Sequence, residues 1–142
     1  MKKILIVQAV FYEKISKMLL EGAVQKILKN NFEYDIVSLK GALEIPCAIS
    51  IANQACKYDG YIALGCVIRG KTSHYETVCQ ESARGINDLA INYQLAIGNG
   101  IITVENEKQA LERADVHKLD KGGFAVEACL EIISLKEKFK KL

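Results

Sequence analysis

The sequence lacks any segment that would divide it into separate parts. It has one proline among 142 residues, no proline-rich linker, no low-complexity stretch and no internal repeat. Half of the residues are hydrophobic and a quarter are charged, which is typical of a chain that buries one core without a disulfide or a metal. A chain of this length suits one domain, so we expect a single domain over residues 1–142.

An excess of charge of one sign is also missing. The 19 basic and 17 acidic residues leave a formal net charge of +2, which gives no reason to expect a nucleic-acid partner. Beyond the N-terminus the longest apolar run covers residues 61–68, whereas a membrane-spanning helix needs about 20 residues. We therefore expect neither a nucleic acid nor a membrane as a partner.

The first residues resemble a signal peptide only superficially. Two lysines precede an apolar stretch from Ile4 to Tyr12, but Gln8 interrupts that stretch and a helical pattern begins immediately after it. No convincing small-residue cleavage site follows. A first β-strand is the better interpretation of this segment.

The five cysteines lack the spacing of a disulfide framework or a zinc site. They form no CxxC pair, and their number is odd. Four of them lie in apolar periodic segments, where a thiol behaves as a small buried hydrophobe. We expect reduced core thiols in a cytoplasmic protein, with no metal site. The cysteines are Cys47, Cys56, Cys66, Cys79 and Cys129.

The sequence does contain a regular alternation of strand and helix patterns. Residues 4–9 and 61–68 are apolar runs of the kind found in strands buried on both faces. Further strands are predicted at residues 34–39 and within residues 95–104. Between the strands, apolar and small residues recur at helical spacing. These stripes are Ile15, Leu19, Ala23 and Ile27; Val78, Ser82, Ile86 and Leu89; and Ala125, Cys129, Ile132 and Leu135.

Local signals place the ends of the helices. Pro46 suits the first position of a helix that runs to about Tyr58. A long helix is predicted from about Ser73, a short one over residues 105–114, and the last one after the glycine pair 122–123. Strands separated by helices need crossover connections, which predicts an α/β fold. We expect a three-layer αβα sandwich with a four-stranded parallel sheet.

The expected fold also indicates where a ligand would bind. In open parallel sheets, ligands bind at the carboxyl ends of the strands. Four segments follow a predicted strand or lie at its end, namely residues 10–12, 41–46, 69–74 and 98–100. We expect the functional site to be built from these segments.

One of these regions matches a nucleotide-binding motif that we reject. Residues 65–72 (GCVIRGKT) fit the P-loop pattern GxxxxGK[ST]. A P-loop needs its strand to end before the first glycine, whereas Cys66, Val67 and Ile68 continue the apolar, β-branched strand. The chain also lacks an apolar strand ending in an aspartate that could hold magnesium. The segment 70–73 can still bind a smaller anion, because it leads into a helix N-terminus.

His74 lies in the first turn of that helix, next to the expected anion site. The positive end of the helix dipole disfavours a second positive charge, so we expect a neutral imidazole. Such a ring beside a phosphoester is well suited to taking and returning protons. The alternative is a surface or capping histidine, and the residues alone leave both interpretations open. His117, between Asp115 and Lys118, is best interpreted as a solvated loop residue.

Other candidates have equally plain alternatives. Phe11, just beyond the first strand, could stack on a planar ring or belong to the core. Glu44 could accept hydrogen bonds from sugar hydroxyls or be a solvated charge. Arg113 and Lys121 flank the link between the last two helices, where most charges are simply solvated.

In combination, these segments resemble the lumazine synthase family. Residues 41–46 (GALEIP) and 64–76 (LGCVIRGKTSHYE) resemble its paired signature. Residues 100–106 (GIITVEN) and 109–113 (QALER) are similar to its fourth strand and the helix that follows, and Lys121-Gly122 to the start of its last helix. The order and spacing hold from about Phe11 to the C-terminus.

The resemblance implies a flavodoxin-like sheet and an active site shared between neighbouring subunits of a homopentamer. It also implies the reaction: 5-amino-6-(D-ribitylamino)uracil condenses with 3,4-dihydroxy-2-butanone 4-phosphate to give 6,7-dimethyl-8-ribityllumazine, phosphate and water. Imine formation, phosphate elimination and ring closure need proton transfer and a cradle for the leaving group, so we expect no cofactor and no metal.

The resemblance further assigns residues to the first substrate. Phe11 would stack on the pyrimidine ring, and Glu44 would accept hydrogen bonds from the hydroxyls of the ribityl chain. Lys121 of the neighbouring subunit would contact the pyrimidine. Ala42 and Leu43 would hold the ribityl chain. Val67 and Ile68 would line the pyrimidine pocket.

A second group of residues is assigned to the phosphate and to proton transfer. Lys71 and Thr72 would bind the phosphate through their backbone N–H groups, together with Arg113 of the adjacent subunit. His74 would transfer protons. Asn99 belongs to the substrate-binding set, since it stands where many members carry an aromatic residue that closes the pocket from the neighbouring subunit.

The sequence departs from the family pattern in two further places. Tyr12 stands where many members have a small polar residue, and the link 115–120 (DVHKLD) lacks the glycines common there. The glycine-poor link, and a first strand that begins at about Lys3, favour an isolated pentamer over a shell of twelve pentamers.

Two other functions compete with lumazine synthesis. A related archaeal-type riboflavin synthase would consume lumazine rather than produce it. A non-catalytic lumazine or flavin carrier would keep the pocket and lose the chemistry, but His74 and Arg113 both persist here.

Overall fold

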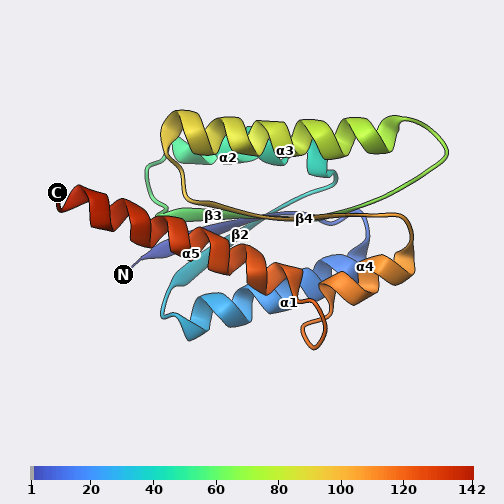
Figure 1. The fold of residues 1–142 in the computed structure, drawn as a ribbon, viewed down its shortest axis with the longest axis horizontal. Coiled ribbons are helices and arrows are strands. Elements are labelled where there is room, and N and C mark those ends of the chain that lie inside the picture. The colour runs from blue at the N-terminus through green and yellow to red at the C-terminus, as the bar shows by residue number, and fades with distance from the viewer. Residues whose placement is uncertain (1) are drawn as a thin grey trace.

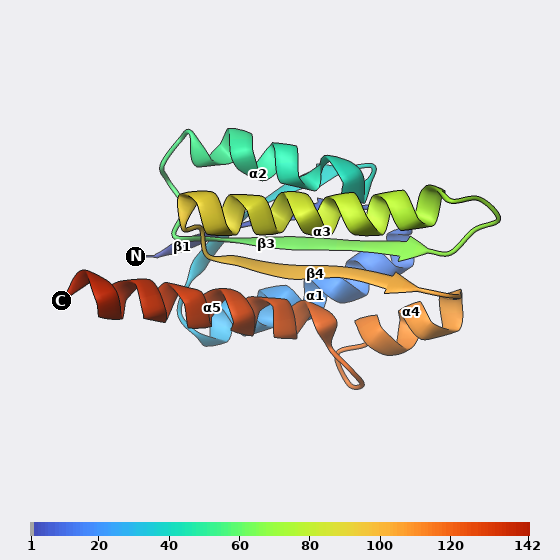
Figure 2. The same ribbon diagram turned by 45° about the horizontal axis from the view of Figure 1, so that its top comes forward.

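The computed structural model describes residues 2–142 as a parallel sheet covered by helices on both faces (Figures 1 and 2). The strands are β1 (Lys3–Ala9), β2 (Glu33–Leu39), β3 (Gly60–Ile68) and β4 (Ile97–Val104). Their order across the sheet is β2-β1-β3-β4, and all three neighbouring pairs are parallel. The predicted four-stranded parallel sheet is therefore confirmed.

The helices form two outer layers, which confirms the three-layer, flavodoxin-like sandwich. One face of the sheet carries α1, α4 and α5, and the other carries η1, α2 and α3 (Figures 1 and 2). The bounds are α1 (Glu13–Lys29), η1 (Ala42–Glu44), α2 (Ile45–Asn53), α3 (His74–Tyr93), α4 (Glu107–Ala114) and α5 (Lys121–Lys140).

Alternation along the central strands divides the core between the two faces. In β1, Ile4 and Ile6 pack on the side of α1 and α5, while Leu5 and Val7 pack on the side of α2 and α3. All four are at most 2% exposed. The continuous apolar run in the sequence thus has the predicted cause, a strand buried on both faces.

Helix α5 lies unusually close to β4. A Cβ built on Gly98 would lie 1.8 Å from the carbonyl oxygen of Ala125, so no larger residue fits there without moving the helix. The close approach buries Ala125, Val126 and Cys129 against the sheet.

Three predicted helix bounds were wrong. Helix α4 begins at Glu107 rather than at Glu105, because the Asn106 side chain accepts a hydrogen bond from Gln109 N at 2.9 Å and caps the helix. Helix α2 ends at Asn53 rather than near Tyr58, because the chain turns towards β3 and Cys56 adopts a left-handed conformation with φ of 53°. Helix α5 begins at Lys121, before the glycine pair, because the Asp120 side chain accepts a hydrogen bond from Gly123 N at 3.1 Å and caps the helix.

The predicted burial was also wrong in places. Ile132 and Leu135 are 37% and 47% exposed, since the side of α5 that carries them faces away from the sheet. Cys47 and Cys56 are exposed and Cys79 is only partly buried, so the expectation of four buried core thiols is wrong. Cys66 and Cys129 are buried as expected, and all five cysteines are free. No helix within residues 2–142 combines the length and apolar character needed to cross a membrane.

Candidate active site

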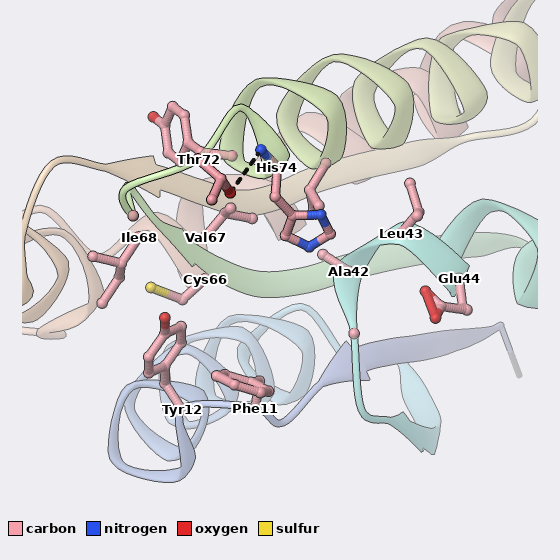
Figure 3. A pocket seen from close by; sticks show the side chains of 14 residues that line it. Phe11, Tyr12, Ala42, Leu43, Glu44, Cys66, Val67, Ile68, Thr72 and His74 are labelled. Carbon is pink, nitrogen blue, oxygen red and sulfur yellow. Dashed lines mark hydrogen bonds between the residues drawn. The ribbon is translucent and has the colours of Figure 1, made fainter.

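A cleft of about 320 Å³ opens at the carboxyl ends of the strands. Three of the four predicted segments line it: the residues after β1, the Gly41–Glu44 turn after β2, and the end of β3 with the loop into α3 (Figure 3). Its lining residues are Phe11, Tyr12, Gly41, Ala42, Leu43, Glu44, Cys66, Val67, Ile68, Gly70, Thr72, His74, Tyr75 and Val78.

The end of β3 forms the wall of the cleft between the two helix layers. Val67 packs on the side of α2 and α3, whereas Cys66 and Ile68 pack on the side of α1 and α5. Burial raises the pKa of the Cys66 thiol to about 11, so the wall presents a neutral, apolar surface. The strand runs unbroken to Ile68, which confirms that no P-loop begins at Gly65.

Two aromatic rings follow β1 and face this wall. Phe11 is 72% exposed, so its interpretation as a core residue is wrong for the single chain. Its ring packs edge-on against Tyr12 at a centroid distance of 4.9 Å. Tyr12 is half-buried, and burial together with the nearby Cys66 raises the pKa of its phenol. An exposed, flat ring at the mouth of an apolar cleft is suited to stacking on a planar ligand.

The turn after β2 presents Glu44 at another part of the cleft. Ala42 is buried and anchors η1, while Leu43 and Glu44 are exposed (Figure 3). A Cβ built on Gly41 would lie 3.4 Å from Oε2 of Glu44, so the carboxylate lies over the start of the turn. This arrangement leaves carboxylate oxygens available as hydrogen-bond acceptors.

His74 is the first residue of α3 and projects into the cleft (Figure 3). Its backbone N–H donates to Oγ1 of Thr72 at 3.3 Å. Val78, one turn later on the same face, is buried and completes this side of the cleft. The imidazole is exposed and lies beside a helix N-terminus, where free N–H groups attract anions.

Four predicted site residues do not line this cleft within one chain. Lys71 is exposed in the loop next to it. Asn99 lies on β4, and Arg113 lies on α4, where its guanidinium donates to the carbonyl of Gln109 at 3.4 Å. The ammonium of Lys121 lies 5.6 Å from the centre of the Phe124 ring. The prediction that Asn99, Arg113 and Lys121 act from a neighbouring subunit stays a prediction.

The sequence-based selection missed several residues of the cleft wall. Helical periodicity predicts only a core position for Val78, although its spacing of four from His74 places both on one helix face. The sequence predicts Cys66 only as a core thiol, and Tyr12 only as a departure from the family pattern. Tyr75 lies within the signature segment 64–76, but nothing in the sequence singles it out, since a residue next to a candidate points about 100° away on a helix.

Comparison with known proteins agrees with this arrangement. A family model described as 6,7-dimethyl-8-ribityllumazine synthase matches residues 1–137. The chain is 56% identical over 137 residues to the 6,7-dimethyl-8-ribityllumazine synthase of Bartonella tribocorum, with 96% of this chain and 91% of that protein covered. It is 50% identical over 139 residues to the protein of the same name from Novosphingobium aromaticivorans, with 98% and 99% covered.

Proposed function

The chain belongs to the 6,7-dimethyl-8-ribityllumazine synthase family, and we propose that its cleft carries out the reaction of that name. The enzyme condenses 5-amino-6-(D-ribitylamino)uracil with 3,4-dihydroxy-2-butanone 4-phosphate. The products are 6,7-dimethyl-8-ribityllumazine, phosphate and water, a step of riboflavin biosynthesis. The observation that carries the proposal is the meeting of Phe11, Glu44 and His74, from three separate segments, in one cleft.

The pyrimidine substrate binds across the aromatic and apolar part of the cleft. The exposed ring of Phe11 stacks on the uracil, between the turn after β2 and the end of β3. Val67 and Ile68 line the ring pocket, while Ala42 and Leu43 hold the ribityl chain. Glu44 accepts hydrogen bonds from the ribityl hydroxyls, because an ionised carboxylate is a pure acceptor.

The butanone phosphate binds beside the N-terminus of α3. The amides of Lys71 and Thr72 point their donors at the phosphate, and the helix dipole adds a favourable field. Arg113 of a neighbouring subunit supplies the positive charge that the single-chain cleft does not contain. Lys121 and Asn99 of that neighbour complete the pyrimidine side.

His74 moves protons between the two substrates. Condensation of an amine with a ketone releases water, and loss of phosphate requires a proton to be taken from carbon or nitrogen and another to be given to the leaving group. Among the described residues, His74 is the imidazole that lines the cleft, and it begins the helix that directly follows the proposed anion site at residues 71–72.

We propose a homopentamer, because the shared site needs a neighbour. Four apolar side chains on one side of α5 are 37–60% exposed, and a row of this kind is typical of a surface that another protein covers. These residues are Phe124, Ile132, Leu135 and Phe139. Light scattering tests the assembly: five subunits per particle are expected, about sixty would contradict an isolated pentamer, and an active monomer would contradict the shared site.

The same proposal includes a single domain over residues 1–142 and a cytoplasmic location, where five free cysteines remain reduced.

The decisive experiment mixes the purified protein with both substrates and follows the absorbance of the lumazine. Formation no faster than the spontaneous reaction would contradict the proposal. Consumption of added lumazine with formation of riboflavin would instead assign the activity of a riboflavin synthase.

A further inference from the structure

The side chain of Arg69 joins three elements at the carboxyl edge of the sheet. Arg69 directly follows β3, and its backbone N–H donates to the carbonyl of Val104 at the end of β4 at 2.9 Å. Its Nε lies 2.6 Å from Oε2 of Glu105, and a terminal guanidinium nitrogen pairs with Glu76 in the first turn of α3. The guanidinium also lies over the Tyr75 ring, 4.3 Å from its centre.

The loop between β3 and α3 has little other support. A Cβ on Gly70 would meet nothing within 4 Å, and Lys71, Thr72 and Ser73 are exposed. The hydrogen bond between Thr72 Oγ1 and His74 N is local, because it joins residues only two positions apart. The contacts of Arg69 are different, since they tie the first residue of this connection to the helix at its far end.

Tyr75 and Glu76 directly follow His74, so fixing them also fixes His74. Successive residues on a helix point about 100° apart, and a turn whose second and third side chains are held against Arg69 has one rotational setting. In that setting the imidazole points into the cleft. A planar guanidinium pairs with two carboxylates in fixed directions while its face lies over a ring, whereas the ammonium of a lysine is a point charge without that fixed geometry.

We propose that Arg69 is a positioning residue for the reaction: it clamps the first turn of α3 to the ends of β3 and β4, and so sets His74 and the amides of Lys71 and Thr72 towards the butanone phosphate. Arg69 does not line the cleft and acts only through these groups. The proposal rests on the proposed function of the same site.

The chain offers a matched control for this clamp. Arg84 also pairs with two carboxylates, those of Glu81 and Asp88, but all three residues lie on the exposed face of α3 and join no other element. Exposed ion pairs contribute little to stability. The variants Arg69→Met and Arg84→Met should therefore melt within about 2 °C of each other and of the unmodified protein.

The kinetic test compares these variants in steady-state assays with both substrates. Arg69→Met should lower kcat by about 10- to 100-fold, since misplacement of a reacting group by about 1 Å has an effect of that order. It should also raise the KM for the butanone phosphate, while the KM for the ribitylaminouracil stays within about twofold. Arg69→Lys should recover part of the loss, and Glu105→Gln should show a smaller loss of the same kind. Arg84→Met should match the unmodified enzyme.

Hydrogen exchange provides a measurement that does not depend on turnover. The amides of His74 and Thr77, which donate to Thr72 Oγ1 and to the carbonyl of Ser73, should exchange faster in Arg69→Met. Amides of the rest of the sheet, and the same two amides in Arg84→Met, should remain unchanged. Equal kinetics and exchange in the two variants would overturn the proposal. The proposal would also be overturned if Arg69→Met changed the KM of both substrates, the melting temperature and exchange throughout the domain together, because that pattern indicates a general structural role. If the unmodified protein forms no lumazine, the proposed function fails, and exchange still decides whether Arg69 orders the loop.

Discussion

The two ends of the cleft are held in place by different means. At the end formed by residues 41–44, Ala42 is 6% exposed, and the chain passes directly into η1 and α2. Helix α3 packs so closely here that a Cβ on Gly85 would lie 2.8 Å from atoms of the Pro46 ring. At the other end, residues 70–74 are exposed, and a Cβ on Gly70 would touch nothing.

The two ends of the site therefore differ in how firmly their residues are held. Close packing fixes the turn that carries Glu44, so the proposed binding of the ribityl chain would use a preformed surface. The loop before His74 depends on a few ion pairs and hydrogen bonds at the surface, and such segments open more easily than packed ones. The part of the site to which we assign phosphate binding and proton transfer is thus the less firmly packed part, and the proposed neighbouring subunit would have the most effect there.

The largest effect is expected at the exposed end, from His74→Ala. Loss of the proton-transfer group should lower kcat by about 10- to 1000-fold, with the lower values reflecting a reaction that partly proceeds unaided. Binding of a ribitylaminopyrimidine analogue, measured by calorimetry, should change far less because Phe11 and Glu44 remain. An unchanged kcat would reduce His74 to a residue of the helix terminus.

Arg113→Ala tests whether the exposed end is completed from outside the chain. It should lower kcat/KM for the butanone phosphate by about 30- to 1000-fold, a loss of about 2–4 kcal/mol of transition-state binding, if the charge is largely buried against the phosphate in the assembly. Inhibition by inorganic phosphate should weaken in parallel. Normal kinetics with unchanged phosphate inhibition would refute a role for Arg113.

Glu44→Gln probes the packed end and should give the opposite kinetic signature. Hydrogen bonds to a charged group contribute about 1.5–3 kcal/mol, so the KM for the ribitylaminouracil should rise by about 10- to 150-fold. The KM for the butanone phosphate should stay nearly constant. A substrate that lacks the ribityl hydroxyls should bind equally to both proteins, and a variant that discriminates against it as strongly as the unmodified enzyme would contradict the assignment.

The smallest effect concerns stability and compares two glycines directly. Gly85→Val should lower the free energy of unfolding by about 1–3 kcal/mol, because its side chain must displace the Pro46 ring. Gly70→Val should change it by no more than about 0.5 kcal/mol, since its Cβ meets open space and its φ is not positive. Urea denaturation of both variants measures the difference, and equal losses would show that the two ends are packed alike.

Much of the fold could be predicted from local patterns. The apolar runs of β1 and β3 indicated strands buried on both faces, and the alternation with helical stripes indicated parallel connections. The carboxyl-end rule then selected the segments around Phe11, Glu44 and His74, which do meet in the cleft. The β-branched character of residues 67–68 correctly excluded a P-loop.

Predictions from local patterns were wrong where the burial or conformation of a residue depends on residues distant in the sequence. Helical spacing placed Ile132 and Leu135 on one stripe, but periodicity does not say whether that side faces the sheet or open space. Cys56, in the link between α2 and β3, adopts a left-handed conformation, and the sequence does not predict it because the position carries neither glycine nor asparagine.

The sequence by itself determined which elements form and at which edge of the sheet the site lies, because burial on two faces and helical periodicity are properties of neighbouring residues. Only the tertiary structure decided how the site is held together. Arg69 and Glu105 are 36 positions apart, and their contact exists because β3 and β4 lie side by side in the sheet. Pairing of this kind depends on the path of the whole chain, since no short stretch of sequence contains both partners.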